Sequence, residues 1–386
     1  MILRHAVSRI TRLLQGFPIV TLTGPRQSGK TTLVRQLLPT KPYVSLEAPA
    51  QREFARMQPA EFLRQYPQGA VIDEAQNAPE IFSELQGVVD ASGDMGLFVL
   101  TGSQNLSVLS NATQSLAGRT ALVELLPLSI AELRDAGQLE AQYASYFVKG
   151  FFPAIYSRKL DAFEWLNATL ITYAERDARQ LAAIQDLGAF QRFLKLTAAR
   201  TGQMLNMQSL ASDAGVSDKT VKHWLSILET CYLIHFVRPH LANFGKRLTK
   251  SPKLYMTDVG LAAALMGIQN ETQMQNHPLR GALFETMVVN DFLKSRANAG
   301  VRSPLYFWRD NIGTEVDLIM ERGNEIAAVE IKSGISVASD AFGNLKKWQK
   351  YATDRGNFSA IYPGLVYGGE ARFTREGVDV MPWNGL

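Results

Sequence analysis

FPIVTLTGPRQSGKTTLVRQLL, residues 17–38, is the stretch that decides the fold of the N-terminal part of the chain. Its first seven residues are mostly apolar or β-branched, which favours a strand, and the residues from Lys30 onward are typical of a helix. Between them, Gly24–Thr31 fits the pattern G-x-x-x-x-G-K-[ST] in its proper strand-to-helix context. The sequence therefore predicts a phosphate-binding loop (P-loop) that joins a strand to a helix.

The chemistry of this loop predicts ATP as the ligand, together with Mg²⁺. Glycines let the backbone curl so that its N–H groups point at the phosphates. Lys30 is expected to reach the β- and γ-phosphate oxygens, and the Thr31 hydroxyl is expected to ligate Mg²⁺. The predicted nucleotide-binding residues are Gly24, Pro25, Arg26, Gln27, Ser28, Gly29, Lys30, Thr31 and Thr32.

Two further strand ends carry polar residues that suit the same site. Asp73 and Glu74 close the apolar run that starts at Gly69. We expect Asp73 to hold the metal and Glu74 to orient or deprotonate the attacking water, although two acids at a helix N-terminus are also reasonable without chemistry. Ser103 and Asn105 follow a third apolar run, and either is a candidate γ-phosphate sensor, with a plain turn or helix cap as the alternative.

The pattern along the chain indicates an α/β protein. Strand-like runs at 17–23, 43–46, 70–72, 97–100 and 121–125 alternate with helical segments, which predicts a parallel sheet covered on both faces. Residues 127–187 are helical in pattern. From 279 a helix, three strands at 305–308, 315–321 and 326–332, and a helix at 344–352 follow.

Composition is that of a globular protein: 386 residues, 46% hydrophobic and 20% charged, with a net charge of +4. This length suggests two or three domains. The single cysteine, Cys231, excludes an internal disulfide and is expected to be buried and inert. No run reaches the roughly 18 apolar residues that span a bilayer, so we expect no membrane partner and a cytoplasmic location.

Residues 207–225 have helix-turn-helix spacing. Gly215 suits the turn and Ser217 the cap of the second helix, which leaves Lys219, Lys222 and His223 facing outward. The following stretch carries cations and no acid, as a basic wing would, and predicts DNA as a partner. A unit that serves only as a lid or protein contact is the alternative. The cations of the stretch are Arg238, Lys246, Arg247, Lys250 and Lys253.

The C-terminal part gathers carboxylates on neighbouring elements. Asp317 lies on one strand, and Glu330 and Lys332 lie two residues apart on its partner, so they project from one face. Glu285 on the preceding helix supplies another oxygen, and such oxygens suit Mg²⁺ or Mn²⁺. These blocks resemble the PD-(D/E)xK nuclease fold, which implies metal ligation by the three carboxylates and a catalytic role for Lys332. A salt-bridged strand pair without chemistry is the alternative.

The order GPRQSGKTTL, AVIDEAQ, LTGSQN and LAGRT resembles the AAA+ ATPases, in particular a bacterial and archaeal subgroup with an uncharacterised C-terminal domain. This resemblance implies three domains: an AAA+ domain with a helical lid (1–187), a winged helix (188–278) and a nuclease-like domain (279–386). It also implies self-association in a ring or other homo-oligomer, such as a hexamer. Arg119 is then the finger that completes a neighbour's site, and Arg176 is a second phosphate-sensing candidate.

Two functions of different classes follow. The first is an oligomeric ATP-hydrolysing motor or remodeller that acts on DNA, with metal-dependent cleavage as an added activity. The second is a nucleotide-dependent regulatory or defence switch whose C-terminal domain only binds partners. Small-molecule phosphotransfer is disfavoured, because it does not need the Asp73–Glu74 pair to activate water.

Overall fold

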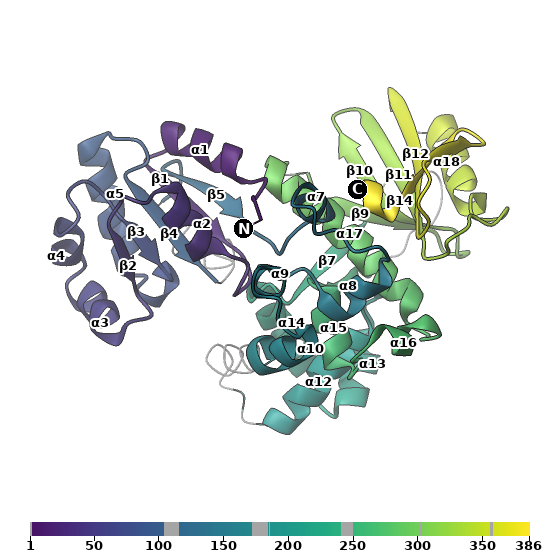
Figure 1. Ribbon diagram of the computed structural model, residues 1–386, viewed down its shortest axis with the longest axis horizontal. Helices are drawn as coiled ribbons and strands as arrows, with labels where there is room; N and C mark the ends of the chain where they lie inside the picture. Colours follow the sequence, from purple (N-terminus) through teal and green to yellow (C-terminus); the bar gives the residue numbers. More distant parts are fainter. Residues whose placement is uncertain are drawn as a thin grey trace.

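The computed structural model describes residues 2–103, 116–171, 184, 186–240, 250–301, 303–355 and 358–386. Figure 1 shows a parallel sheet with its helices on the left, a group of helices below the centre, and a second sheet on the right. No helix among the described residues has both the length and the apolar character needed to cross a membrane.

The N-terminal sheet is fully parallel, as the alternating pattern predicts. Its five strands lie in the order β2-β3-β4-β1-β5, with β1 in register between β4 and β5. Because the strands are parallel, the ends of β1, β3 and β4 meet at one edge of the sheet. The strands are β1 (Ile19–Thr23), β2 (Tyr43–Ser45), β3 (Val71–Asp73), β4 (Phe98–Gly102) and β5 (Thr120–Glu124).

Helices cover both faces of this sheet. Alternation along β1 sends Val20 and Leu22 to the face where α1 and α2 pack, and Ile19 to the face covered by α3, α4 and α5. Side chains from the strands and helices are fully buried on both faces, which accounts for the near-continuous apolar runs of the sequence. The helices are α1 (Val7–Gly16), α2 (Lys30–Leu37), α3 (Pro49–Met57), α4 (Pro59–Arg64) and α5 (Ile81–Ser92).

The middle of the chain is helical, as predicted, and one buried carboxylate organises it. Asp258 caps α15 through the Leu261 N–H (3.0 Å) and accepts the Phe151 N–H (2.8 Å), which fastens the turn before α9. Gly150 and Gly260 meet at this contact, where a Cβ on Gly260 would lie 2.5 Å from the Gly150 nitrogen. The elements are α7 (Ile130–Asp135), α8 (Ala144–Lys149), α9 (Pro153–Arg158), α10 (Ala162–Trp165), the π-helix η2 (Leu166–Ile171), α12 (Leu187–Ala199), α15 (Val259–Leu265) and α16 (Glu271–Gln275).

The two helices predicted around Gly215 are present as α13 (Met207–Ala214) and α14 (Asp218–Thr230). Gly215 has φ +73° in the turn, and the Ser217 side chain accepts the Thr220 N–H. Six residues of α14 are buried, and Lys219, Lys222 and His223 are exposed on the opposite side. The buried residues are Val221, Trp224, Leu225, Ile227, Leu228 and Thr230.

A second sheet of nine strands runs from the middle of the chain into its C-terminal part, in the order β13-β14-β12-β11-β10-β9-β7-β8-β6. The two parts of the chain are connected within the sheet by β7, which pairs in parallel with β9 at Arg238↔Tyr306 and Pro239↔Phe307. The sheet therefore crosses the boundary expected at residue 278, and the division into 188–278 and 279–386 remains a prediction. The strands are β6 (Gln203–Met204), β7 (Ile234–Pro239), β8 (Lys253–Met256), β9 (Leu305–Arg309), β10 (Glu315–Arg322), β11 (Glu325–Lys332), β12 (Ala360–Tyr367), β13 (Phe373–Arg375) and β14 (Val378–Pro382).

Two helices cover the C-terminal half of this sheet. The long helix α17 (Arg280–Ala299) contacts β11 on one side and β5 of the N-terminal sheet on the other, and it lies near the centre of Figure 1. On the other face, Phe342 and α18 (Gly343–Arg355) pack Leu345 and Trp348 against Trp308 of β9. The short helix η3 (Trp383–Gly385) ends the chain against α7.

Candidate active site

The P-loop joins β1 to α2 in a backbone conformation that needs its glycines. Gly24 has φ +145°, and a Cβ there would lie 2.2 Å from the Leu125 carbonyl oxygen. Gly29 has φ +93° and forms the N-cap of α2, while Gln27 also takes a positive φ of 63°. Residues other than glycine rarely adopt such angles, so the loop is held in this shape by its surroundings.

Lys30 is buried at the start of α2, and its ammonium donates to the carbonyl oxygens of Gly24 (2.9 Å) and Pro25 (2.8 Å). Burial lowers the pKa of Lys30 to about 8, against the opposing attraction of Glu74 and Asp73. The ammonium is thus inside the curve of the loop, where the sequence predicted it would meet phosphate oxygens.

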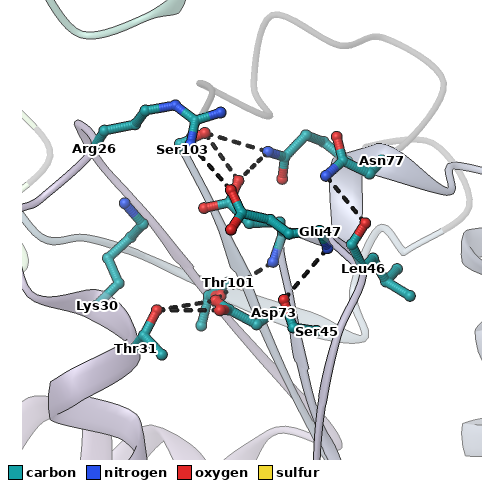
Figure 2. Close-up of polar contacts among 12 residues, drawn as sticks. Arg26, Lys30, Thr31, Ser45, Leu46, Glu47, Asp73, Asn77, Thr101 and Ser103 are labelled. Atoms are coloured by element: carbon teal, nitrogen blue, oxygen red, sulfur yellow. Dashed lines mark hydrogen bonds and ion pairs between the residues drawn. The ribbon is translucent and has the colours of Figure 1, made fainter. Parts of the chain in front are cut away.

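Thr31 and Asp73 face each other across the strand edge (Figure 2). The Thr31 hydroxyl lies 3.1 and 3.2 Å from the two carboxylate oxygens of Asp73, which also accept the Tyr43 hydroxyl (2.6 Å) and the Thr101 hydroxyl. Desolvation and this carboxylate together raise the pKa of Tyr43, so its hydroxyl stays a donor. A hydroxyl and a carboxylate side by side are hard oxygen donors that fit Mg²⁺.

Glu74, directly after Asp73, is buried and has a φ of 55°. Its carboxylate accepts the Ser103 hydroxyl (2.9 Å) and the Gln76 side-chain amide. Ser103, the predicted phosphate sensor, therefore lies at the right strand edge, and in this structure its hydroxyl binds Glu74. Gln76 also donates to Ser103 (3.3 Å) and was not singled out from the sequence.

A cavity of about 590 Å³ adjoins these groups. The P-loop lines it together with Asp73 and Glu74, and the chain before α1, the side of α2 and helix α9 add apolar and polar side chains. This volume falls in the range of sites for small organic ligands. Outside the P-loop motif its lining includes Ile2, Leu3, Arg4, Val7, Leu33, Gln36, Leu37, Glu47, Leu128, Pro153, Ala154, Ser157 and Arg158.

Arg4 is a site residue that the sequence did not reveal. Its buried guanidinium donates to the carbonyl oxygens of Ser28 (2.7 Å) and Leu126 (2.6 Å) and to the Glu132 carboxylate (3.0 Å). Glu132 also forms a capping box with Ser129 at the start of α7. The spacing Ser129-x-x-Glu132 marks that cap, but no local signal points from it to Arg4.

Arg119 precedes β5, at the edge of the sheet opposite the P-loop, because the parallel strands carry their first residues there. Its guanidinium makes a two-pronged ion pair with Asp90 of α5, with both distances 2.6 Å. Arg119 therefore does not belong to the nucleotide site of its own chain, and its role toward a neighbour remains a prediction. Asn105, Arg176, Lys246 and Arg247 lie outside the described residues.

The C-terminal carboxylates converge as the hairpin predicts. Glu330 and Lys332 form an ion pair at 2.6 Å, and Asp317 accepts the Ile331 N–H at 2.8 Å. Burial, then the nearby Asp317, raise the pKa of Glu330 to about 8 and that of Glu285 to about 7. Glu285 reaches the group from α17.

The sequence-based assignment of Lys253 to an exposed basic wing is wrong. Lys253 is 3% exposed, and its ammonium lies 2.8 Å from Glu285, 2.5 Å from Glu315 and 3.6 Å from Asp317. Burial opposes the charge, but Tyr255 and the carboxylates outweigh it and the pKa of Lys253 rises well above its ordinary value.

The predicted metal set of Glu285, Asp317 and Glu330 has no support in this geometry. Among the described residues, no group of three or more acidic, histidine or cysteine side chains is placed to hold a metal ion. The physical reason is that lysines already lie against all three carboxylates: Lys253 against Glu285 and Asp317, and Lys332 against Glu330. A metal implied by nuclease resemblance therefore does not fit the residues as they lie.

Similarity to known proteins covers nearly the whole chain. Residues 16–134 match the model of an AAA domain, and residues 140–272 and 280–386 match two domains of unknown function (DUF8612 and DUF4143). The uncharacterized proteins Rv2008c of Mycobacterium tuberculosis and Mb2031c of Mycobacterium bovis are each 32% identical to this chain over 332 residues. The alignment covers 85% of this chain and 73% of each relative. The chain belongs to their family.

In this member of the family, the AAA match includes the P-loop, Asp73, Glu74 and Ser103. Together with the parallel sheet, it makes the N-terminal unit a P-loop ATPase domain of the AAA type. A solved structure of a Walker-type ATPase from Pyrococcus abyssi is 16% identical, covers 67% of this chain and 94% of its own, and has a TM-score of 0.46. That likeness is too low to carry an argument about function.

Proposed function

We propose that this protein binds ATP with Mg²⁺ in the cavity at the P-loop and hydrolyses its terminal phosphate bond. The observation that carries the proposal is the meeting of Lys30, Thr31, Asp73 and Glu74 at one strand edge beside a cavity of about 590 Å³. A bound Mg²⁺ would neutralise phosphate charge, and Thr31 with Asp73 would hold it.

The protein's own groups account for the remaining steps. Lys30 exchanges its bonds to the loop carbonyls for phosphate oxygens, and the loop N–H groups bind the same phosphates. Glu74 accepts the proton of the attacking water, after Ser103 and Gln76 have set the direction of its carboxylate. Apolar lining residues, including Val7, exclude water from the base of the nucleotide.

ATP turnover of the purified chain tests this proposal. Lys30→Ala should abolish turnover and weaken ATP binding, since it removes the only ammonium that lines the described part of the cavity. Lys195→Ala, an exposed lysine of α12, is the matched control and should behave as wild type. Equal turnover by Lys30→Ala and wild type would refute hydrolysis at this site.

We further propose that the ATP cycle acts on DNA. A second cavity, of about 740 Å³, lies where β7 meets β9, and two cations and three aromatic side chains line it together with the paired His240 and Glu321. Aromatic faces beside cations suit stacked bases and their phosphates. The exposed cations of α14 supply further positive charge for DNA phosphates. The cations are Arg238 and Lys250, and the rings are those of Phe236, Tyr306 and Phe358.

The regulatory switch remains the second candidate, and DNA-dependent turnover separates the two. A DNA-acting protein should hydrolyse ATP faster with branched, duplex or single-stranded DNA, and Arg238→Glu with Lys250→Glu should lose this stimulation at unchanged basal rate. A switch should turn over slowly whether or not DNA is present. Unchanged DNA binding by the double variant would show that the second cavity does not bind DNA.

We also propose that the active form contains several subunits. Arg119 lies six strand positions from Gly24 of its own P-loop, or about 20 Å at about 3.3 Å per residue, so only a neighbour's site is open to it. Lys30→Ala and Arg119→Ala subunits should each be inactive alone. An equal mixture should recover about a quarter of the sites if neighbours share them at random. No recovery in the mixture would count against a shared site.

A further inference from the structure

Lys253 has unusual surroundings for a lysine. It is the first residue of β8, a strand whose four side chains are all buried. Its ammonium lies 2.8 Å from Glu285 of α17 and 2.5 Å from Glu315 of β10. The Tyr255 hydroxyl, from the same face of β8, donates to the same Glu285 oxygen at 2.6 Å.

The oxygens around Lys253 are of the chemical type that a divalent cation binds. Glu285, Glu315 and Asp317 each offer an oxygen within 3.6 Å of the ammonium nitrogen. A divalent ion bound to them would need distances of about 2.0–2.6 Å. An ammonium ion already bound among the same oxygens excludes it, because both occupy one volume and both carry positive charge.

The neighbouring cations do not compete for this position. Lys332 pairs with Glu330 at 2.6 Å, and Arg309 pairs with the other Glu315 oxygen at 2.8 Å. Each binds the rim of the carboxylate group. One buried oxygen of Glu330, Oε2, has no hydrogen-bond partner, so the group still has acceptor capacity beyond what the three cations satisfy.

We infer that the Lys253 ammonium takes the place of a divalent metal ion among these carboxylates. The cluster is then a metal-free ion-pair joint, and it would become a metal site only if the ammonium were removed. The carboxylates come from α17 and β10 and the ammonium from β8, so the joint ties the middle of the chain to its C-terminal part. This inference goes beyond the proposed function, because it depends on neither ATP hydrolysis nor DNA.

Two consequences distinguish this joint from a metal-dependent nuclease centre. The wild-type protein should bind no Mn²⁺ through Asp317. Removal of the ammonium should leave three carboxylates in one volume and create a Mn²⁺ site where none exists. Lys253→Met keeps the length of the side chain without its charge, and Asp317→Asn keeps the shape of its side chain without the negative charge.

Mn²⁺ titration of nucleotide-free, full-length protein, followed by the electron paramagnetic resonance signal of free Mn²⁺, tests both consequences. Wild type and Asp317→Asn should bind the same number of ions. Lys253→Met should bind one more, and Lys253→Met/Asp317→Asn should lose it. A Mn²⁺ ion that wild type binds and Asp317→Asn does not would overturn the inference, as would a folded Lys253→Met that gains none.

Thermal unfolding provides a second readout. Mn²⁺ should raise the melting temperature of Lys253→Met toward that of wild type and leave wild type unchanged. Lys253→Arg, which keeps the positive charge, should not respond to Mn²⁺. If Lys253→Met does not fold, the comparison of wild type with Asp317→Asn still decides the case, since a metal centre requires a difference between them.

Discussion

The buried guanidinium of Arg4 holds the P-loop to the start of the helical region, and its removal is the sharpest test of how the nucleotide site is built. Arg4→Met keeps the bulk of the side chain and deletes its donors. Three bonds disappear: those to the carbonyl oxygens of Ser28 and Leu126 and that to the Glu132 carboxylate. One of the lost partners belongs to the P-loop itself.

The expected loss in free energy of unfolding depends on the hydrogen bonds that each partner of Arg4 retains. Removal of one member of a buried ion pair costs about 3–5 kcal/mol, because the other charge stays buried. Glu132 retains the N–H groups of His5 (2.8 Å) and Ser129 (2.9 Å), which favours the lower end, about 3 kcal/mol. For a unit of 150–250 residues that corresponds to a fall of roughly 6–12 °C in melting temperature.

Calorimetry measures the fall, and hydrogen exchange of residues 24–32 reports whether the P-loop loosens with it. Arg12→Met, an exposed arginine of α1, is the matched control and should shift the melting temperature little. The Arg4→Met/Glu132→Gln double variant should lose less free energy of unfolding than the sum of the two single changes, with a coupling energy of about 1–3 kcal/mol. A melting temperature equal to that of Arg12→Met would show that the three bonds contribute nothing.

Three further predictions concern other parts of the molecule. Glu74→Gln should bind ATP like wild type and lower turnover by about 10²–10⁴-fold, measured by calorimetric titration and steady-state kinetics, if the carboxylate is the base. Burial lowers the pKa of Lys30 to about 8, below the ordinary 10.5. ATP affinity should therefore fall as the pH rises through about 8, when the ammonium loses its proton. Lys30→Arg should remove this pH dependence. Gly260→Ala should cost several °C in melting temperature or prevent folding, because its Cβ would lie 2.5 Å from the Gly150 nitrogen, whereas Gly281→Ala has open space and should not.

The N-terminal part of the fold was largely predictable because its signals are local. The P-loop pattern, the strand before it and the helix after it lie within residues 17–38, and the structure places all three as expected. The convergence of Asp73 and Ser103 also followed from one rule, that parallel strands end at the same edge. Arg119 could be placed on a strand boundary, but no local pattern reveals its pairing with Asp90.

Distant contacts account for what the sequence did not reveal. Lys253 reads as one cation in a basic stretch, and only the packing of α17 and β10 beside β8 shows that three carboxylates surround it. Arg4 fails to stand out for the same reason, since its partners follow 24, 122 and 128 residues later. Strand β12 was missed because Pro363 and Gly364 interrupt its pattern, although it pairs with β11 over its full length.

The join between β7 and β9 decides where this chain can be cut. Only two residue pairs connect the strands there, yet both strands are interior strands of a sheet of nine. A fragment that begins near residue 280 would carry β9 without its partner β7, and the N-terminal fragment would expose the edge of β7 in the same way. Open strand edges recruit other strands and promote aggregation. Each fragment should therefore aggregate when it is produced alone, and mixing the two fragments should restore solubility because β7 and β9 pair again.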